Sequence, residues 1–372
     1  MQLPGTQLKM PRESEKPTEA LRKIEVCGQA QKAGGGPRSN GAQRPPPAVL
    51  ARLDRAVGFL AQEQLPDGEF PSLVSAEPEL RRRCAPDTNY FATSQVLWSL
   101  GFVPGRRASS LARRAARFLA AGVECDGSWR FFTPKVVRRI DPDVDVTACA
   151  GAALRGREER LGYDPRRTRS ILLSACDEVG RFRTWIRKDP RNDLDSVANA
   201  NALWFLRNDP AAKGCAHWLQ NLVESNVSLG TFPYYESPLA LYHAIARAIF
   251  AGASQLAPLR QRVVDNILSM ARVDGSFGNV LETAFAVCAL HNLGASGEVA
   301  VRHAVSLLSR RQRRDGSWPA LAAWNGPELP APRSLWWGGE CWTTALAVEA
   351  LARFAYPTRC QPLRKPCSAL VL

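Results

Sequence analysis

The sequence predicts an all-α fold, an (α/α)6 barrel in which six helical hairpins form a toroid. Two observations lead to this class. Amphipathic segments alternate with segments that are apolar on nearly every face, six of each. A glycine-centred turn recurs between the two kinds of segment, and the hairpins repeat about every 40–60 residues. Because the apolar segments must be covered on all sides, we expect them inside and the amphipathic ones outside; an open superhelix is the structural alternative.

The amphipathic helices each carry one apolar stripe. In the first, Val49, Leu53 and Val57 recur at helical spacing, and Val301 and Val305 do so in the last. The opposite face is charged, which is typical of a helix with one side in water. In chain order, the predicted outer helices are residues 46–64, 107–121, 166–186, 210–224, 256–271 and 296–313.

The second helix of each hairpin is rich in alanine and other apolar residues. The segment "DVTACAGAAL" (145–154) is an example. A helix that is hydrophobic all round is buried in the core of a large domain. In chain order, the predicted inner helices are residues 89–100, 145–154, 195–206, 236–249, 282–293 and 342–354.

A turn with a glycine shortly before an aromatic residue joins the two helices in four places. The glycine supplies the left-handed backbone conformation that ends a helix, and the aspartate before it hydrogen-bonds backbone donors of the turn. We interpret Trp129, Phe277 and Trp318 as structural residues that pack the turn against a neighbouring helix. The four turns read "QLPDGEF" (64–70), "VECDGSW" (123–129), "MARVDGSF" (270–277) and "RQRRDGSW" (311–318).

The two ends of the chain differ from the repeats. Residues 1–44 combine three successive glycines with scattered charge and little periodicity, which predicts a disordered basic leader. Residues 357–372 are predicted to be a short C-terminal tail. We therefore expect one barrel domain over residues 45–356, and no apolar run is long enough to span a bilayer.

The composition narrows the location and the partners. The formal net charge is +14, but the arginines are spread in short groups such as Arg81-Arg82-Arg83, so no nucleic-acid partner is predicted. The ten cysteines contain no Cys-x-x-Cys pair, which is typical of a reduced, cytoplasmic protein. A peripheral membrane contact and a homodimer are left open.

The stretch "RRIDPDVDVTACAGAAL" (138–154) carries carboxylates at every second position. Asp141, Asp143 and Asp145 stand directly before a run of small apolar residues. Acidic residues at a helix N-terminus are common caps, which is the structural interpretation. The chemical interpretation is a carboxylic acid kept protonated at neutral pH, because two close carboxylates cannot both ionise cheaply.

These motifs resemble those of the terpenoid-cyclase and protein-prenyltransferase superfamily. "QRRDGSW" (312–318) is similar to the Gln-x3-Gly-x-Trp repeat of squalene and hopene cyclases, and "QLPDGEF" (64–70) matches with Phe in place of Trp. "DVDVTA" (143–148) is similar to the Asp-x-Asp-Asp-Thr-Ala motif of class II terpene cyclases. The resemblance covers residues 46–356 and implies a single-barrel member.

The resemblance implies a role for each residue of the acidic motif. The proton donor falls on Asp145 and its supporting partner on Asp143, while Val146 stands where the family has its last aspartate. A class II cyclase protonates an alkene or epoxide in a dry pocket. The N-terminus of the following helix would then stabilise the carboxylate that remains.

The cation formed in such a reaction needs electron-rich walls, since each aromatic face attracts a cation by about 0.5–2 kcal/mol. His243, on the fourth predicted inner helix, could hydrogen-bond the acid or be a structural histidine. We expect several aromatic residues at the entrances of the inner helices to face one cavity. They are Tyr90, Phe91, Trp185, Tyr234, Tyr235, Trp336, Trp337 and Trp342.

A second acidic entrance follows one repeat later, in "DPRNDLDSVANAN" (189–201). By sequence, its Asp193 and Asp195 align with Asp143 and Asp145. One interpretation is that the repeat reuses aspartate as a helix cap. The other is that these residues, with Asn199 and Asn201, add polar groups to the substrate pocket, where they would bind a head group or hold a water molecule near the acid.

Four functions fit these features. The first is a class II-type isoprenoid cyclase that acts on a linear polyprenyl substrate without a cofactor, with Mg²⁺ involved only if the substrate bears a diphosphate. The second is a prenyltransferase-like barrel, which needs zinc; the sequence shows no matching ligand set, so no metal site is predicted. The third is a sugar hydrolase that uses Asp145 and Asp195 as acid and base. The fourth is a non-catalytic isoprenoid-binding barrel.

Overall fold

The computed structural model describes residues 46–137, 140–187, 192–225, 231–326 and 335–357, and the fold below is that of the unit Arg44–Leu372. The predicted leader, residues 1–44, lies outside the described residues, as does the predicted tail beyond residue 357. The domain boundaries taken from the sequence therefore stay predictions.

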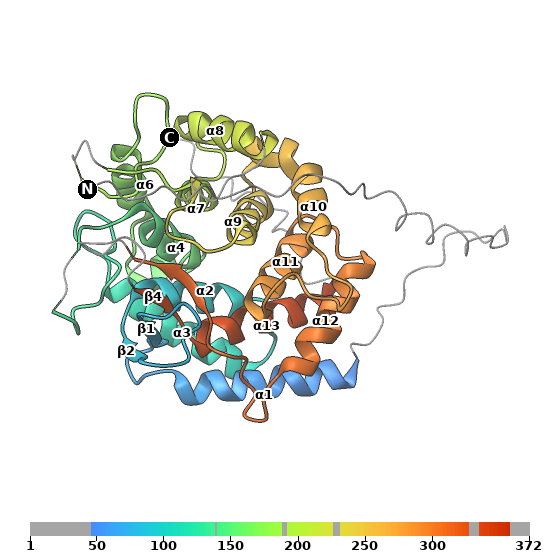
Figure 1. Cartoon of the computed structure of the whole chain (residues 1–372). Coiled ribbons are helices and arrows are strands. Elements are labelled where there is room, and N and C mark those ends of the chain that lie inside the picture. The colour runs from blue at the N-terminus through green and yellow to red at the C-terminus, as the bar shows by residue number, and fades with distance from the viewer. Residues whose placement is uncertain (1–45, 138–139, 188–191, 226–230, 327–334, 358–372) are drawn as a thin grey trace, which may run out of the picture. The chain divides into compact units, whose positions relative to one another are not determined.

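Six apolar helices form a closed inner ring. Each one packs against the next in chain order, and the last packs against the first, as Figure 1 shows. This confirms the predicted barrel. The inner helices are α2 (Tyr90–Leu100), α4 (Val144–Ala153), α7 (Ser196–Leu206), α9 (Pro238–Ala251), α11 (Val280–Asn292) and α13 (Glu340–Ala355).

The inner helices are apolar but short. Every residue of α7 is buried, and in α4 only Asp145 of the ten residues is not. No helix in the described ranges combines the length and the apolar character needed to cross a membrane.

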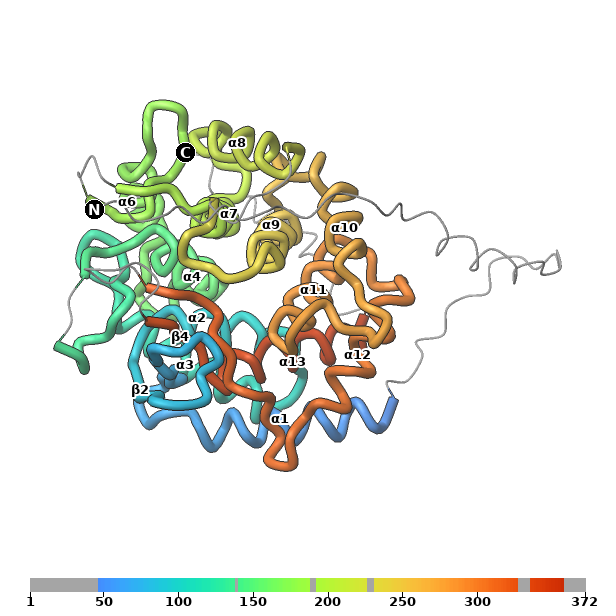
Figure 2. Tube along the Cα trace, viewed as in Figure 1, coloured from blue at the N-terminus to red at the C-terminus, as the bar shows by residue number. Residues whose placement is uncertain are grey.

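Six amphipathic helices surround the ring, and each packs on an inner helix, which the tube of Figure 2 makes easy to follow. Short helices precede three of them: α5 (Glu158–Leu161), η1 (Pro210–Ala212) and η3 (Ser254–Leu259). The outer helices are α1 (Pro47–Glu63), α3 (Arg106–Ala121), α6 (Pro165–Ser174), α8 (Lys213–Glu224), α10 (Arg260–Ser269) and α12 (Val299–Arg311).

The third outer helix is shorter than the predicted range of residues 166–186. It ends at Ser174, and the chain then turns within residues 176–182. Asp177 N–H donates to the carbonyl of Arg181 at 2.8 Å, and Gly180 N–H donates to the carbonyl of Asp177 at 2.9 Å. The four predicted glycine turns make the same pair of bonds. This fifth turn was missed because its glycine follows valine rather than aspartate.

The aromatic residues of these turns fix the start of the inner helices. The backbone N–H of Trp129 donates to Thr147 Oγ1 on α4 at 3.0 Å, and its indole N–H donates to the carbonyl of Leu119 on α3 at 2.8 Å. Trp318 makes the equivalent bonds, to Thr344 at 3.0 Å and to a carbonyl of α12 at 2.9 Å. The structural interpretation of both tryptophans is confirmed.

The glutamines of the family-like repeats join neighbouring hairpins. Gln312 Nε2 donates to the carbonyl of Gly316 in its own turn at 3.0 Å and to the carbonyl of Arg52 on α1 at 2.9 Å. Gln64 connects its own turn to α3 in the same way. Each glutamine therefore satisfies two carbonyls while it holds one repeat against the next.

A small antiparallel sheet, which the sequence did not predict, connects the first and last hairpins. Its order is β2-β1-β4-β3, and β1 pairs with β4 from the far end of the chain. The strands are only three or four residues long, too short for an alternating pattern to show. They are β1 (Ser72–Ser75), β2 (Ala85–Asp87), β3 (Ala322–Asn325) and β4 (Trp336–Gly338).

Candidate active site

The acidic stretch opens α4, and its two central aspartates have different positions. Asp143 is the N-cap of the helix, and its Oδ1 accepts a hydrogen bond from the Val146 N–H at 2.7 Å. Asp145 lies in the first turn and is partly buried. Asp143 therefore stabilises the start of the helix, whereas the Asp145 carboxyl is available to other elements of the ring.

Two other repeats hold the Asp145 carboxyl. Nδ2 of Asn201, on α7, donates to Oδ1 at 2.6 Å. The hydroxyl of Tyr235, shortly before α9, donates to Oδ2. The Cys149 thiol lies one turn along α4, with its Sγ 3.7 Å from Oδ1. Because fixed donors face both oxygens, the site is built to stabilise the ionised carboxylate.

A buried arginine orients this arrangement. Arg247 Nη2 donates to Asn201 Oδ1 at 2.8 Å, and Nη1 donates to Gln95 Oε1 at 2.5 Å. Since a guanidinium only donates, it draws the amide oxygen of Asn201 to itself and leaves the amide NH₂ for Asp145. The guanidinium also stacks on Trp204, 3.8 Å from the ring centroid. The polar network thus runs from α2 through α9 and α7 to α4.

Burial raises the pKa of three carboxyls at this end of the ring. For Asp145, burial is the largest cause, and its two hydrogen-bond donors and the charge of Arg247 oppose it. Burial, followed by the charge of Asp145, raises the pKa of Asp195 to about 8. Burial also holds the pKa of Asp143 well above its usual range. Burial, more than the neighbouring carboxylate, is thus what favours a protonated Asp145.

The second acidic entrance is placed differently from its sequence alignment. Asp195 is the N-cap of α7, and its Oδ1 accepts from two backbone N–H groups of the first turn at 2.7 and 2.9 Å. It therefore occupies the position of Asp143, so the predicted alignment with Asp145 is wrong by two residues. Asp193 lies before the helix, where it accepts a hydrogen bond from the Tyr234 hydroxyl.

Asn199 belongs to the missed turn. Its Oδ1 accepts from the Phe182 N–H at 2.8 Å, and its Nδ2 donates to the Phe182 carbonyl at 2.8 Å. It thus holds the turn as Thr147 holds Trp129. With its amide engaged by the backbone, Asn199 is an anchor of this repeat.

A small cavity inside the ring adjoins the Asp145 network. The volume in which the centre of a water molecule fits is about 10 Å³, so the cavity has room for about one water molecule. Four residues that were predicted to bind substrate line it: Phe91, Tyr235, His243 and Trp342. The lining also includes Phe285 and the hydrogen-bonded residues Asn201 and Arg247.

An aromatic cluster fills the space next to this cavity. Trp324 of β3 packs on Trp342 with ring centroids 4.6 Å apart and on Phe91 at 5.0 Å. Phe131 lies 6.1 Å from Trp324. These contacts join the small sheet to the inner ring at the end where Asp145 lies.

Five of the eight predicted aromatic residues lie elsewhere than in the lining of this cavity, and one of them, Trp336, donates its indole N–H to a glutamate just before α9. Tyr90 packs against a phenylalanine of α3. The Trp337 indole N–H donates to Asp87 within the sheet. Trp185 packs edge to face on Tyr234, with centroids 6.4 Å apart. An aromatic residue near the start of an inner helix can face the outer ring or the sheet, and sequence position alone does not separate these cases.

Gln95 and Arg247 belong to the site but were not among the predicted site residues. The signal for Arg247 is its setting, since it is the one charged residue in the segment "PLALYHAIARAIFA" of α9. A charge in an all-apolar helix is costly to bury without partners, so it indicates a buried polar network. Gln95 gives no comparable signal.

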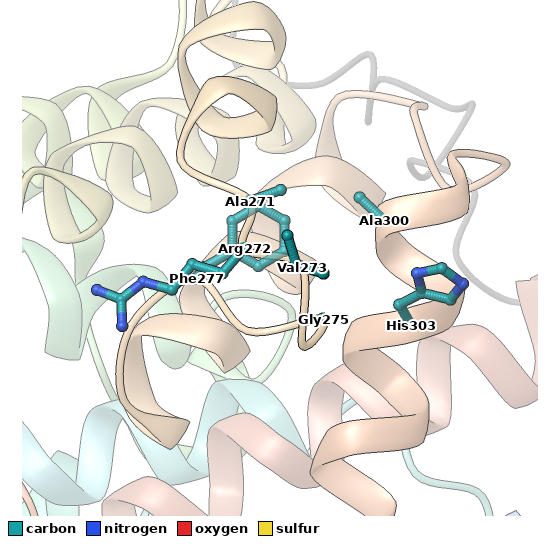
Figure 3. Close-up of a pocket in the computed structure, with 7 residues that line it drawn as sticks. All are labelled: Ala271, Arg272, Val273, Gly275, Phe277, Ala300 and His303. Carbon is teal, nitrogen blue, oxygen red and sulfur yellow. The ribbon is translucent and has the colours of Figure 1, made fainter. Parts of the chain in front are cut away.

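A second hollow, of about 300 Å³, lies at the outer layer between the turn after α10 and α12. Figure 3 shows Ala271 and Val273 of the turn facing Ala300, with His303 further along α12. Its lining residues carry no carboxylate. Nowhere in the described ranges do three or more His, Cys, Asp or Glu side chains gather as a metal ion would need.

No family model matches the chain, and no curated protein matches it in sequence. Solved structures match it in fold. The type II terpene cyclase MstE from Scytonema superposes with a TM-score of 0.60 at 17% identity, over 83% of this chain and 99% of that one. Variants of MstE have also been solved with geranylgeranyl dihydroxybenzoate as substrate and with merosterolic acid A as product.

Two further structures show how widely this fold is used. The ent-copalyl diphosphate synthase from Streptomyces platensis matches with a TM-score of 0.54 at 19% identity, over 71% of this chain and 50% of that one. An alpha-amylase from Clostridium perfringens matches at 0.55 with 11% identity, over 82% and 98%. The chain has the fold of the type II terpene cyclases. Because an amylase has a similar fold, the fold alone does not determine the reaction, which depends on the side chains of the site.

Proposed function

We propose that this protein is a class II-type isoprenoid cyclase, in which Asp145 starts the cyclisation of a linear polyprenyl substrate by protonating it. One observation carries the proposal. A carboxyl in the first turn of an inner helix is held through both oxygens by donors from two other repeats, beside an aromatic-lined cavity. Such a group can keep a proton while it is buried and is stabilised once it has given the proton away.

The reaction is an isomerisation without change of redox state. The proton leaves the Asp145 carboxyl and bonds to one carbon of a terminal alkene, whose π electrons form the new C–H bond. The neighbouring carbon becomes cationic, and the next alkene attacks it to form a C–C bond. A final proton loss restores an alkene and balances the proton taken up at the start.

The protein must keep Asp145 protonated and yet make it a strong acid. Burial raises its pKa, which retains the proton near neutral pH. After transfer, Asn201 and Tyr235 donate to the carboxylate, and the nearby charge of Arg247 stabilises it further. Phe91, Phe285 and Trp342 supply aromatic faces for the cation.

The departure at Val146 fits this assignment. Val146 is almost fully buried, and its backbone N–H is the donor that Asp143 caps. A third carboxylate at this position would be buried beside Asp143. Here, neutral side chains from other repeats serve as the partners of Asp145, so the acid is supported without the family's last aspartate.

The cavity must enlarge to admit a substrate. Its present room for about one water molecule is far below what a polyprenyl chain occupies. Phe91 and Trp342 line the cavity, and Trp324 of the sheet packs on both of them, so we infer that these side chains move when a substrate binds.

The proposal includes a reaction without a cofactor, in which Mg²⁺ takes part only if the substrate bears a diphosphate. It also includes a cytoplasmic location and a peripheral membrane contact. Whether the protein forms a homodimer stays open.

The sugar-hydrolase alternative has weaker support despite the fold shared with an amylase. It needs a second free carboxylate, and Asp195 was the candidate. In the structure, Asp195 is fully buried and accepts two backbone N–H groups as the cap of α7. A carboxylate committed in this way is poorly placed to activate a water molecule.

The test compares Asp145→Asn with Asp195→Asn in purified protein, with farnesyl, geranylgeranyl and squalene-type substrates and mass spectrometry of the products. We expect Asp145→Asn to lose cyclisation by at least about 100-fold, in the range of general acid catalysis. Asp195→Asn keeps a capping side chain and should lose far less. Circular dichroism controls the fold of both variants. Cyclisation by folded Asp145→Asn at the wild-type rate would contradict the proposal.

A further inference from the structure

The cavity beside Asp145 is lined by hydrogen-bond donors that have no acceptor. Each of the four side chains concerned is at most 5% exposed. Among the described residues of this lining, no oxygen atom is left in that condition. Buried polar groups are normally satisfied, so this set lacks an acceptor. The unpartnered donors are Gln95 Nε2, Arg247 Nε and Trp342 Nε1, and His243 Nε2 is unpartnered as well, donating or accepting according to the tautomer of the imidazole.

The orientation of Gln95 follows from its neighbour. Arg247 can only donate, so the amide oxygen of Gln95 must face it, as the 2.5 Å bond shows. The amide NH₂ of Gln95 is therefore the group that lacks a strong acceptor. The atom of α4 next to this NH₂ is the Cys149 sulfur, which is a weak acceptor.

Arg247 has no anion in direct contact among the described residues. Its partners are the amide oxygens of Gln95 and Asn201, the Cys149 sulfur at 3.9 Å and the face of Trp204. Asp145 is one hydrogen bond further away. If Asp145 holds the proton that the proposed reaction needs, the buried guanidinium has no counter-charge there, and such a state is strongly disfavoured.

Burial opposes ionisation of the other titratable groups around the cavity. Burial raises the pKa of the acidic ones, which favours their neutral forms, and lowers the pKa of His243. The positive charges of Arg247 and of Arg353, which lies on α13, lower the pKa of His243 further. The acidic groups are Asp143 and Cys149 of α4, Asp195 at α7 and Tyr235 before α9.

We propose that Arg247 and Gln95 form a subsite for a carboxylate, and that the natural ligand is an isoprenoid acid whose head group binds there. The isoprenoid nature of the ligand and the missing counter-charge, which assumes a protonated Asp145, rest on the proposed function, whereas the unpartnered donors do not. The apolar part of the ligand lies against Phe91, Phe285 and Trp342. A bound carboxylate balances Arg247 and so favours the protonated form of Asp145. Ligand binding and proton uptake are thereby coupled.

The probes are farnesoic acid and farnesol, which share their chain and differ in the head group. Titration at pH 7 is followed by tryptophan fluorescence, because Trp342 lines the cavity and Trp324 packs on Trp342. We expect wild type to bind the acid at least about tenfold more tightly than the alcohol, as one hydrogen bond to a charged group gives. Arg247→Gln should bring this ratio close to one, with the affinity for the alcohol little changed.

Arg310→Gln, on the exposed face of α12, is the matched control for the loss of one charge and should keep the wild-type ratio. If Arg247→Gln fails to fold by circular dichroism, Gln95→Met provides the test and should weaken acid binding by roughly tenfold. Calorimetry in two buffers of different ionisation enthalpy should show net proton uptake with the acid in wild type and none in Asp145→Asn.

Equal affinity of wild type for acid and alcohol, no binding of the acid, or an unchanged ratio in folded Arg247→Gln would each overturn the subsite. These measurements do not depend on turnover. A protein that cyclises but shows no preference for the acid contradicts the subsite alone. A protein that prefers the acid but forms no cyclic product contradicts the proposed reaction alone.

Discussion

At the scale of single residues, the site gives different surroundings to two aspartates that look alike in the sequence. Asp143 meets a backbone N–H of its own helix, while Asp145 meets side chains from two other hairpins. The sequence placed the acid at the start of an inner helix. It indicated Asn201 only as one of several polar residues that could reach the pocket, and it did not indicate Arg247, because these residues come from repeats 56 and about 100 residues further along the chain.

Tyr235→Phe tests the donor to Asp145 Oδ2. Loss of a hydrogen bond to a charged group weakens the stabilisation of the carboxylate, so we expect turnover to fall by about 10–100-fold. The same loss favours the protonated form and raises the pKa of Asp145 further. The alkaline limb of the pH–rate profile should therefore move to higher pH.

The matched control is Tyr234→Phe, which removes a hydroxyl bonded to Asp193 instead. Turnover and pH–rate profiles of the two variants are measured beside wild type. An equal effect of the two substitutions, or a profile of Tyr235→Phe that shifts to lower pH, would be inconsistent with the role given to Tyr235.

At the scale of elements, the glycine turns decide where outer helices stop and inner helices begin. The helical periods and the Asp-Gly signals were enough to place all six hairpins. They failed for residues 176–182, where a valine precedes the glycine, and for the sheet, whose short strands carry no period of their own. The turn lacks the aspartate that precedes the glycine in the other four, whereas the sheet depends on pairing between the first and last hairpins, which a local pattern does not contain.

Gly127→Ala tests how closely the turns pack on the next repeat. Gly127 has a φ of +91°, and a Cβ there would lie 2.5 Å from the backbone nitrogen of Thr168 on α6. Gly294→Ala is the control, because its φ is +81° and a Cβ would meet nothing within 4 Å. We expect the control to lose about 1–2 kcal/mol from the left-handed conformation alone, and Gly127→Ala to lose clearly more. Urea unfolding measures both; equal losses would show that the turn can move away.

At the scale of the whole barrel, the ring closes where α13 meets α2. Arg353 Nη1 contacts Glu349 Oε1 at 3.0 Å, and Glu349 Oε2 accepts from Ser99 of α2 at 2.9 Å. Arg353 also bonds Asn292 of α11 at 2.6 Å. The closed ring was predictable from six equivalent hairpins, whereas the part that this buried ion pair plays was not, because its hydrogen-bond partners Ser99 and Asn292 lie on two other inner helices.

Glu349→Gln tests this closure. It leaves the fully buried Arg353 without its counter-charge, which we expect to reduce the free energy of unfolding by about 3–5 kcal/mol. Glu340→Gln breaks a partly exposed pair with Arg313 at the other end of the same helix and should cost under about 1 kcal/mol. The two variants are compared by urea unfolding. A loss in Glu349→Gln no larger than in Glu340→Gln would mean that the pair does not hold the ring closed.

The central claim is that Asp145 delivers a proton to a carbon atom of the substrate, and incorporation of solvent deuterium measures this step directly. A carboxyl proton exchanges with solvent, whereas a new C–H bond does not. Wild type is incubated in D₂O with an all-alkene polyprenyl substrate, and the product is returned to H₂O before mass spectrometry. The account predicts a cyclic product that carries one retained deuterium and is absent with Asp145→Asn. A cyclic product without deuterium, or one formed equally by folded Asp145→Asn, would contradict it.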